Sequence, residues 1–466
     1  MFNFFTVTIT ILFVLLVGLY LTYKMRFIQV REFNRGWIKM FRHNQSKNGL
    51  SSFSAASLAI GGRIGTGNIA GVALAIYLCG YGVMFWLWVA AFFGMALSFV
   101  ETTLAQVYKE YDEDGEYLSG PMVYIERGIG GKYKYLGYAY GILLAFTVGF
   151  MYIVIHTKTI ISSVLAFAGV TSDIQLESFL VLIIMLIAAY ILYGGTKKVA
   201  RVAAYVVPVM MISYIVLVLL IALAHLEFIP KFFMLIIGNA FTPGGVLGGG
   251  VLTMIVVASA LSTLSNEAGL GTSTLAAGLA NGSHPAQQGF VNMITIFIDV
   301  VICSLTAFVL ILAIDSGSLF AELVVPSNMA MESFDSLYKG GNVLLVLFIL
   351  VFTFTTLITS ITYGLQVIKQ LMLNHSYRSY KIVINLYLIA VFILIILTPF
   401  IQLQKSAITA IVEVASVSLL AINIFAIYKL RRVAYKVYEH YHTVGHDFKA
   451  EDIGVEYKAG ENDIWI

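Results

Sequence analysis

The chain has 466 residues, of which 59% are hydrophobic and only 11% are charged, and its mean hydropathy is +0.89. Soluble globular proteins carry about 25% charged residues, so this composition excludes a soluble domain and predicts a chain that faces lipid or apolar helices. Cys79 and Cys303 both fall inside apolar stretches, so no disulfide framework is expected. The net charge of +3 says little by itself, and no nucleic-acid partner is expected.

Apolar runs long enough to cross a membrane follow one another along the whole chain. A spanning helix needs roughly 20 mostly apolar residues, and backbone in lipid must satisfy its own hydrogen bonds, so each run predicts a helix. Eleven such runs occur, at residues 4–23, 53–79, 82–108, 136–168, 178–196, 202–224, 248–280, 288–314, 342–368, 382–401 and 406–428. Several exceed 25 residues, which predicts tilts, kinks or breaks.

The basic residues indicate the orientation of these helices. Twenty-three of the 28 Lys and Arg residues lie in five alternate segments, at residues 24–52, 109–134, 197–201, 369–381 and from 429 onward. The intervening loops hold only Lys231, Lys339 and Lys405, while Arg63 and Lys158 lie inside predicted spans. Because Lys-rich and Arg-rich loops face the cytoplasm, we expect the N-terminus outside and the C-terminus inside, in a multi-pass protein of the inner or plasma membrane.

Two segments outside the spans mix aromatic and basic residues at helical spacing. Residues 27–42 are expected to lie as a helix along the inner membrane surface, and the alternative is a solvated linker. Residues 429–442 have the same character.

Two spans are interrupted near their middles by glycine and polar residues. Residues 61–68 read GGRIGTGN, and residues 265–272 read SNEAGLGT. Each glycine weakens a helix by about 1 kcal/mol relative to alanine, so both runs are expected to break. Two such interruptions, five spans apart, are typical of a five-plus-five inverted repeat with discontinuous helices at the substrate site.

The expected organisation therefore has four parts. An N-terminal helix with a basic segment (1–52) precedes a first repeat (53–224) and a second repeat (248–428), and a basic cytoplasmic tail (429–466) follows.

A broken helix exposes amide and carbonyl groups that an intact helix consumes. The half-helix after Asn68 points its positive dipole end toward the bilayer centre, which suits a carboxylate, and freed carbonyls suit an ammonium group or a small cation. A zwitterionic amino acid satisfies both. The alternative is close helix packing through small residues, which leaves Arg63, Asn68 and Glu267 unexplained. The substrate-binding candidates at the breaks are Gly65, Thr66, Gly67, Asn68, Asn266, Glu267, Ala268, Gly269, Gly271 and Thr272.

The same residues carry a family resemblance. The string GTGNIAGVA at 65–73, FWLW at 85–88, GEY at 115–117 with GPM at 120–122, and SNEAGLG at 265–271 resemble the signatures of the alanine-or-glycine:cation symporter family. The resemblance runs from about residue 50 to 430. It implies an all-α leucine-transporter-type fold with one additional N-terminal helix, and uptake of alanine, glycine or a similar neutral amino acid driven by sodium.

The resemblance also implies a sodium ion between the first broken helix and the stretch FTFTT at 352–356. Hydroxyls of Thr355 and Thr356 and freed carbonyls from Gly62 to Gly65 are the candidate ligands. The alternative is that both threonines bond back to their own helix. No other cofactor is expected.

This chain departs from the family on the wall that is expected to face the breaks. His156 and Lys158 stand where the family usually has Gln and Asn, and His156 is added to the substrate-binding candidates. A lysine within the membrane costs about 2.5 kcal/mol or more and is a functional candidate; the alternative is that Lys158 extends to the outer surface. His156 alternatively serves as a hydrogen-bonding residue between helices.

The remaining charged residues of the spans have two interpretations. Arg63 and Glu267, together with Lys158, are candidates for coupling or specificity, and Arg63 and Glu267 are expected to neutralise each other across the breaks. For the acids Glu101, Asp299 and Glu413, structural hydrogen bonding is the favoured role.

The leading hypothesis is a sodium-coupled symporter for a small neutral amino acid. The alternatives are transport of a larger polar amino acid such as glutamine, proton coupling through His156, Lys158 or Glu267, and an amino-acid sensor. No enzyme is expected, because motifs such as HExxH and GxSxG are missing. The sequence does not specify a monomer or an oligomer.

Overall fold

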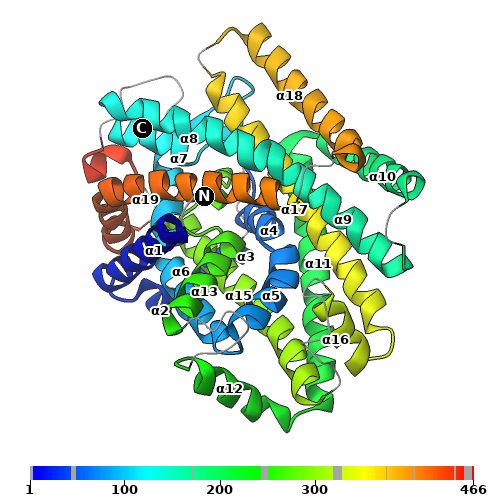
Figure 1. Cartoon of the computed structure of the whole chain (residues 1–466). Helices are drawn as coiled ribbons and strands as arrows, with labels where there is room; N and C mark the ends of the chain where they lie inside the picture. The colour runs from blue at the N-terminus through cyan, green and yellow to red at the C-terminus, as the bar shows by residue number, and fades with distance from the viewer. Residues whose placement is uncertain are drawn as a thin grey trace.

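The computed structural model describes residues 4–42, 49–170, 173–242, 250–317, 328–373, 375–401, 405–445, 448–455 and 464–465. Within these residues the chain is helical apart from one short antiparallel hairpin (Figure 1). The first half contains α1 (Phe4–Lys24), α2 (Ile28–Arg31), α3 (Phe33–Phe41), α4 (Ser52–Arg63), η1 (Thr66–Asn68), α5 (Ala70–Cys79), α6 (Val83–Tyr108), β1 (Glu110–Tyr111), β2 (Tyr117–Leu118), α7 (Pro121–Tyr124), η2 (Ile125–Ile129), η3 (Gly131–Tyr133), α8 (Lys134–Phe146), η4 (Thr147–Met151), α9 (Tyr152–Ala168), α10 (Ile174–Leu192) and α11 (Gly195–Ala224). The second half contains α12 (Phe228–Asn239), α13 (Val251–Asn266), α14 (Ser273–Gly278), α15 (Ala286–Asp315), α16 (Met329–Leu337), α17 (Gly341–Leu371), α18 (Tyr377–Leu397), η5 (Thr398–Phe400), α19 (Lys405–Thr443) and η6 (Ala450–Ile453).

Eight helices in the described residues are long and apolar enough to cross a membrane, or nine if a strongly bent pair counts as one span. The bent pair joins α4 to the segment from η1 through α5, with an angle of 62° between its halves. The other two of the eleven predicted runs correspond to α1 and to α13 with α14. Helix α1 covers its whole predicted run, 4–23, whereas α13 and α14 have 16 and 6 residues. The all-helical class and a multi-span chain are thus established, while the count of eleven and the orientation stay predictions.

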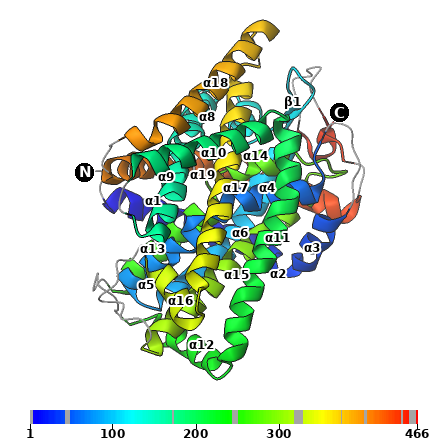
Figure 2. The same cartoon turned by 90° about the vertical axis from the view of Figure 1, so that its right-hand side faces the viewer.

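Both predicted interruptions are present, and one long helix, α15, packs against both broken helices. The first break separates α4 from α5, and the second separates α13 from α14. The long helix α15 packs against α4, α5, α6 and α13, so one helix contacts both broken pairs. The helix α17 packs against α4 and α9 on another side of the first break. In Figure 2, α17 and α11 run side by side along the molecule, with α12 and α16 near one end and β1 toward the other.

The amphipathic segment predicted at 27–42 forms α2 and α3. Helix α3 packs closely along α15, because Gly36 has no side chain to separate them: a Cβ there would lie 2.6 Å from the carbonyl oxygen of Phe290. The segment is therefore a docked helix and not a solvated linker. Residues 429–442 continue α19 without interruption to Thr443.

Two short helices, α12 and α16, lie outside the predicted spans and were not predicted from the sequence. Helix α12 packs against α6 and α15, and the indole of Trp86 donates a hydrogen bond to the carbonyl of Ala240 just after α12, at 2.8 Å. Their apolar stretches are too short to have been counted as spans.

Candidate functional site: two broken helices joined by buried acids

The first break is held open by its own asparagine. Gly65 is extended, and its amide donates to the Asn68 side-chain oxygen at 3.0 Å, so Asn68 caps the turn of η1. Thr66 and Gly67 are only partly buried, and no heavy atom lies within 4 Å of the position that a Cβ on Gly67 would take. The break therefore presents the backbone of Thr66 and Gly67 to open space.

The second break contains three residues in the left-handed region of backbone space. Glu267 follows the last residue of α13 with φ of 56°, and Gly269 and Gly271 have φ of 85° and 83°. A Cβ on Gly271 would also lie 2.3 Å from the ring of Pro121, so only glycine fits there. Asn266 accepts a hydrogen bond from the amide of Ala268 at 3.0 Å and thereby stabilises the end of α13.

One carboxylate on α15 joins the two breaks. The side-chain amide of Asn68 donates to Asp299 Oδ1 at 2.6 Å, and the hydroxyl of Ser265 donates to both Asp299 oxygens at 3.0 and 3.1 Å. Asp299 is 2% exposed, so these bonds are made away from water. Asp299 thus makes the structural hydrogen bonds that were expected of it, and these bonds connect the two breaks. Sequence reasoning assigned Asn68 to substrate, whereas the structure commits its side chain to the turn and to Asp299.

A second buried carboxylate holds the far side of the second break. Glu101 on α6 accepts from the amide of Gly269 at 3.1 Å and from the side chain of Asn423 at 3.2 Å. Asn423 on α19 in turn donates to the carbonyl of Gly269 at 2.8 Å, and the hydroxyls of Tyr124 and Tyr140 bond to Asn423 and to the carbonyl of Leu270. The freed backbone of the second break is therefore largely satisfied by side chains from α6, α8 and α19.

Several buried polar atoms near the breaks have no partner among the described residues. They are Arg63 Nε and Nη2, Glu267 Oε2, the hydroxyls of Thr353, Thr359 and Tyr363, and both ring nitrogens of His156. The hydroxyl of Thr272 is close enough to the Glu267 carboxylate to interact with it. Tyr363 is close enough to both Arg63 and Glu267 to interact electrostatically with them. Native interiors leave few polar groups unpaired, so such a concentration marks a site that another polar group completes.

Arg63 and Glu267 lie close enough to interact electrostatically across the breaks, as expected, but without direct contact. No ion pair joins them in the described part of the chain; Arg63, at the end of α4, donates instead to the hydroxyl of Thr295 on α15. Only one nitrogen of the guanidinium has this partner, and its Nε and Nη2 have none among the described residues. One guanidinium and one carboxylate are thus both buried near the breaks without a mutual bond.

The threonines of α17 lie against the first break. Thr356 Oγ1 donates to the carbonyl of Ile64 at 3.2 Å and to the carbonyl of Phe352 at 2.9 Å, and a Cβ on Gly65 would lie 3.1 Å from the same hydroxyl. Thr355 bonds back to Phe352 at 2.8 Å, as the alternative for these residues predicted. A Cβ on Gly62 would lie 3.2 Å from the hydroxyl of Tyr363, so this part of α4 also faces α17. Carbonyl and hydroxyl oxygens from two helices therefore meet at this surface, which is the ligand chemistry of a small hard cation.

His156 and Lys158 lie in two different environments of α9. The ring of His156 packs edge-on against that of Tyr152, with centroids 5.7 Å apart, and Tyr152 is close enough to Glu267 to interact electrostatically with it. Tyr152 was not among the predicted residues, since a tyrosine in an apolar run carries no distinguishing signal. Lys158 instead donates to the carbonyl of Ile401 and lines a cavity together with Glu413 and Tyr152. Glu413 is exposed and has no hydrogen bond among the described residues, contrary to the structural role expected for it.

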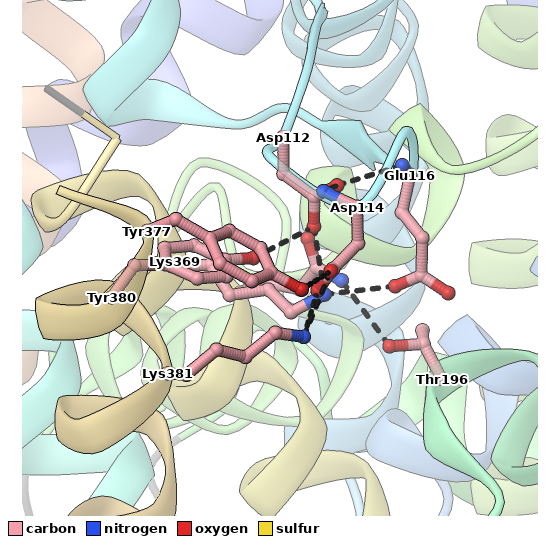
Figure 3. A network of polar contacts seen from close by, with 9 residues as sticks. Asp112, Asp114, Glu116, Thr196, Lys369, Tyr377, Tyr380 and Lys381 are labelled. Atoms are coloured by element: carbon pink, nitrogen blue, oxygen red, sulfur yellow. Dashed lines mark hydrogen bonds and ion pairs between the residues drawn. The ribbon is translucent and has the colours of Figure 1, made fainter. Parts of the chain in front are cut away.

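A third polar cluster lies at the other end of α17 (Figure 3). Lys369 Nζ lies 2.8 Å from both Asp112 Oδ2 and Glu116 Oε2, which belong to the β1–β2 hairpin, and Asp112 also accepts from Tyr380 at 3.1 Å. Lys381 on α18 pairs with Asp114 at 2.7 Å. This cluster, here called the hairpin network, connects the loop after α6 to α17 and α18. It contributes no residue to the site at the two breaks.

A bundle of apolar helices in which two broken helices meet buried polar groups defines a secondary transporter. The chain matches the family described as the sodium:alanine symporter family over residues 1–453, and it belongs to that family. It is 32% identical over 431 residues to the amino-acid carrier protein AlsT of Bacillus subtilis, covering 91% of this chain and 87% of the relative. It is also 32% identical over 374 residues to the sodium/alanine symporter AgcS of Methanococcus maripaludis, covering 78% and 81%.

Among solved structures, the fold is similar to that of MhsT in complex with L-phenylalanine. The TM-score is 0.50 at 15% identity, with 90% of this chain and 94% of that chain covered. The family and these relatives confirm the predicted class: the protein is a multi-pass plasma-membrane transporter of the amino-acid:cation symport type, and not an enzyme.

Proposed function

We propose that the protein is a sodium-coupled symporter of a small neutral amino acid of the alanine or glycine class, which works by alternating access. The observation that supports this most directly is the meeting of two broken helices beside unpartnered buried groups of both charges. An amino-acid carboxylate suits the open backbone at Thr66 and Gly67, and its ammonium group suits the unpartnered oxygen of Glu267.

The proposed architecture has eleven spans, an outside N-terminus and an inside C-terminus. Residues 53–224 and 248–428 form the two opposed repeats, with α1 as an additional helix in 1–52 and the basic tail in 429–466. The proposed substrate site comprises Gly65, Thr66, Gly67, Asn68, His156, Asn266, Glu267, Ala268, Gly269, Gly271 and Thr272. Arg63, Lys158 and Glu267 are the candidates for coupling or specificity.

Uptake into proteoliposomes tests the proposal. A panel of labelled amino acids that includes L-alanine, glycine and L-glutamine is offered with sodium and proton gradients imposed separately. We expect alanine or glycine to accumulate only under an inward sodium gradient. Accumulation driven by protons alone, or of glutamine alone, would support one of the alternatives, and no uptake by folded protein would favour the sensor.

The proposed sodium ion lies between α4 and α17, with Thr356 and the carbonyls of Ile64 and Gly62 to Gly65 as ligands and Thr355 beside them. Of the two threonines, only Thr356 reaches a carbonyl of the broken helix. We therefore expect Thr356→Val to raise the sodium concentration for half-maximal alanine uptake at least tenfold, because a methyl group replaces a ligand oxygen.

Thr362→Val is the matched control, because the Thr362 hydroxyl bonds only to Ile358 of its own helix, at 2.8 Å. If Thr356→Val and Thr362→Val both keep the sodium dependence of the unmodified protein, the result argues against a sodium site at Thr356.

A further inference from the structure

The additional helix α1 packs against α19, and basic and tyrosine side chains gather where the two helices meet (Figure 1). Lys24 is the last residue of α1 and directly follows the predicted span 4–23, and Arg431 lies shortly after the predicted span 406–428 in α19. Both bases therefore lie where the predicted hydrocarbon layer ends and the lipid headgroups begin. We call the group formed by Tyr20, Lys24, Arg431 and Tyr435 the basic seam.

Contacts between the two helices bring the four side chains of the basic seam together. The guanidinium carbon of Arg431 lies 6.0 Å from the ring centroid of Tyr20. Lys24 is close enough to Tyr20 to interact with it electrostatically, and so is Tyr435, which lies one turn beyond Arg431. Two cationic groups and two hydroxyls from two helices therefore meet at one place.

The positive charges of the basic seam have no carboxylate near them in the sequence. Residues 1–31 and 425–438 contain no Asp or Glu. Glu32, the first acid of the chain, is buried and pairs with Arg35 at 2.6 Å. Neither base of the seam forms an ion pair within the described residues. An anionic group bound at the seam would therefore supply a countercharge that the helices themselves do not provide.

The surroundings of the basic seam favour a lipid over a free ion. Leu16, Leu19 and Tyr23 follow one another along one face of α1 and are 62%, 47% and 70% exposed, and Tyr428 of α19 is 47% exposed. These apolar surfaces suit acyl chains that extend from a headgroup at the seam. A neutral lipid such as phosphatidylcholine brings its own ammonium group, whereas two bases without an acid favour a lipid with a net negative charge.

We propose that the basic seam is a binding site for the headgroup of an anionic phospholipid, with Lys24 and Arg431 on the phosphate. The hydroxyls of Tyr20 and Tyr435 are further hydrogen-bond donors to the headgroup. Basic pockets between membrane helices are one way in which membrane proteins bind such headgroups. A lipid held by both helices joins the additional helix α1 to α19.

Equilibrium binding of labelled lipid to the purified full chain in a neutral detergent tests the basic seam. Fluorescent phosphatidylglycerol is the probe, and fluorescent phosphatidylcholine is the neutral comparison. We expect phosphatidylglycerol to bind at least tenfold more tightly, and millimolar inorganic phosphate not to displace it. Each base near an anionic headgroup contributes about fivefold in affinity, so Lys24→Gln combined with Arg431→Gln should weaken phosphatidylglycerol binding at least tenfold. Binding of phosphatidylcholine should stay within twofold.

Lys132→Gln combined with Lys134→Gln is the matched control, because both lysines are exposed and lie over rings of their own neighbours in the chain, Tyr133 and Tyr135. Equal weakening in both double variants would show an effect of net charge alone and overturn the site. Equal binding of the two lipids by the unmodified protein, or displacement of the probe by inorganic phosphate, would overturn it as well.

Lys24→Gln alone changes an exposed side chain and is expected to weaken phosphatidylglycerol binding about fivefold. An unchanged melting temperature of each variant in lipid-free detergent establishes that weaker binding does not arise from unfolding. The measurement involves no amino acid, so its result is independent of the proposed function.

Discussion

Alanine uptake is expected to fall at least a hundredfold when Asp299 is replaced by alanine. The substitution removes the acceptor that Asn68 and Ser265 share. It leaves the Ser265 hydroxyl buried without this partner and the Asn68 amide with only the weak acceptor Cys303 Sγ, at 3.3 Å. Each unsatisfied buried donor costs about 1–3 kcal/mol, so we also expect the free energy of unfolding to fall by about 3 kcal/mol. Proteoliposome uptake and thermal unfolding of the purified protein measure the two effects.

Asp315→Asn, on the same helix, provides the control. Asp315 pairs with Lys231 at 2.7 Å, but the two side chains are 23% and 50% exposed, and exposed pairs contribute about 0–1 kcal/mol. Asp299→Asn keeps the shape but replaces one acceptor with a donor, so it should impair uptake strongly as well. Uptake in Asp299→Ala within threefold of the unmodified protein would contradict a bridge between the breaks.

The second large effect is expected at the hairpin network. Lys369→Met removes the cation that two carboxylates share, and the Asp112 side chain is fully buried. Removing one partner of a buried ion pair typically costs about 3–5 kcal/mol, because the remaining charge stays uncompensated. Backbone amides of Asp114 and Glu116 still donate to Asp112, so we expect a loss near the lower end, about 3 kcal/mol.

Lys381→Met is the matched comparison, since it removes a neighbouring lysine whose ion pair with Asp114 is 42% and 28% exposed. Its expected loss of stability is about 0–1 kcal/mol. Thermal unfolding of both variants under one condition gives the comparison directly. Equal destabilisation would show that burial of the Asp112–Lys369 pair contributes nothing to its effect.

The sequence was informative wherever the signal is local. Hydropathy located the helices, because roughly 20 apolar residues are needed to cross lipid. Glycine clusters located both breaks within a few residues, since glycine weakens a helix and tolerates the positive φ found at Gly269 and Gly271. The family motifs then indicated the class of protein that the comparisons confirm.

The sequence was less informative about which polar groups meet. Arg63 and Glu267 were matched by charge alone, and nothing in the sequence indicated that Arg63 donates a hydrogen bond to Thr295, 232 residues away. Similarly, nothing near Lys369 in the chain indicates Asp112, which is 257 residues distant. Such pairings depend on how helices pack, and a single sequence does not record packing.

The hydrogen bonds of Asp299 and Thr356 also distinguish two surfaces around the first break. A bond from Asn68 and a bifurcated bond from the Ser265 hydroxyl to one buried carboxylate connect η1 and α13 to α15, so we expect the two interruptions to move together. The contact with α17 is a hydroxyl of Thr356 shared between Ile64 and Phe352, and that hydroxyl keeps a partner when α4 moves away. Sliding between α4 and α17 would therefore cost one shared hydrogen bond of Thr356. Separating the two interruptions from each other would cost the hydrogen bonds of Asn68 and Ser265 to Asp299. If the protein works by the proposed alternating access, we expect the movement between α4 and α17 and not between the two breaks.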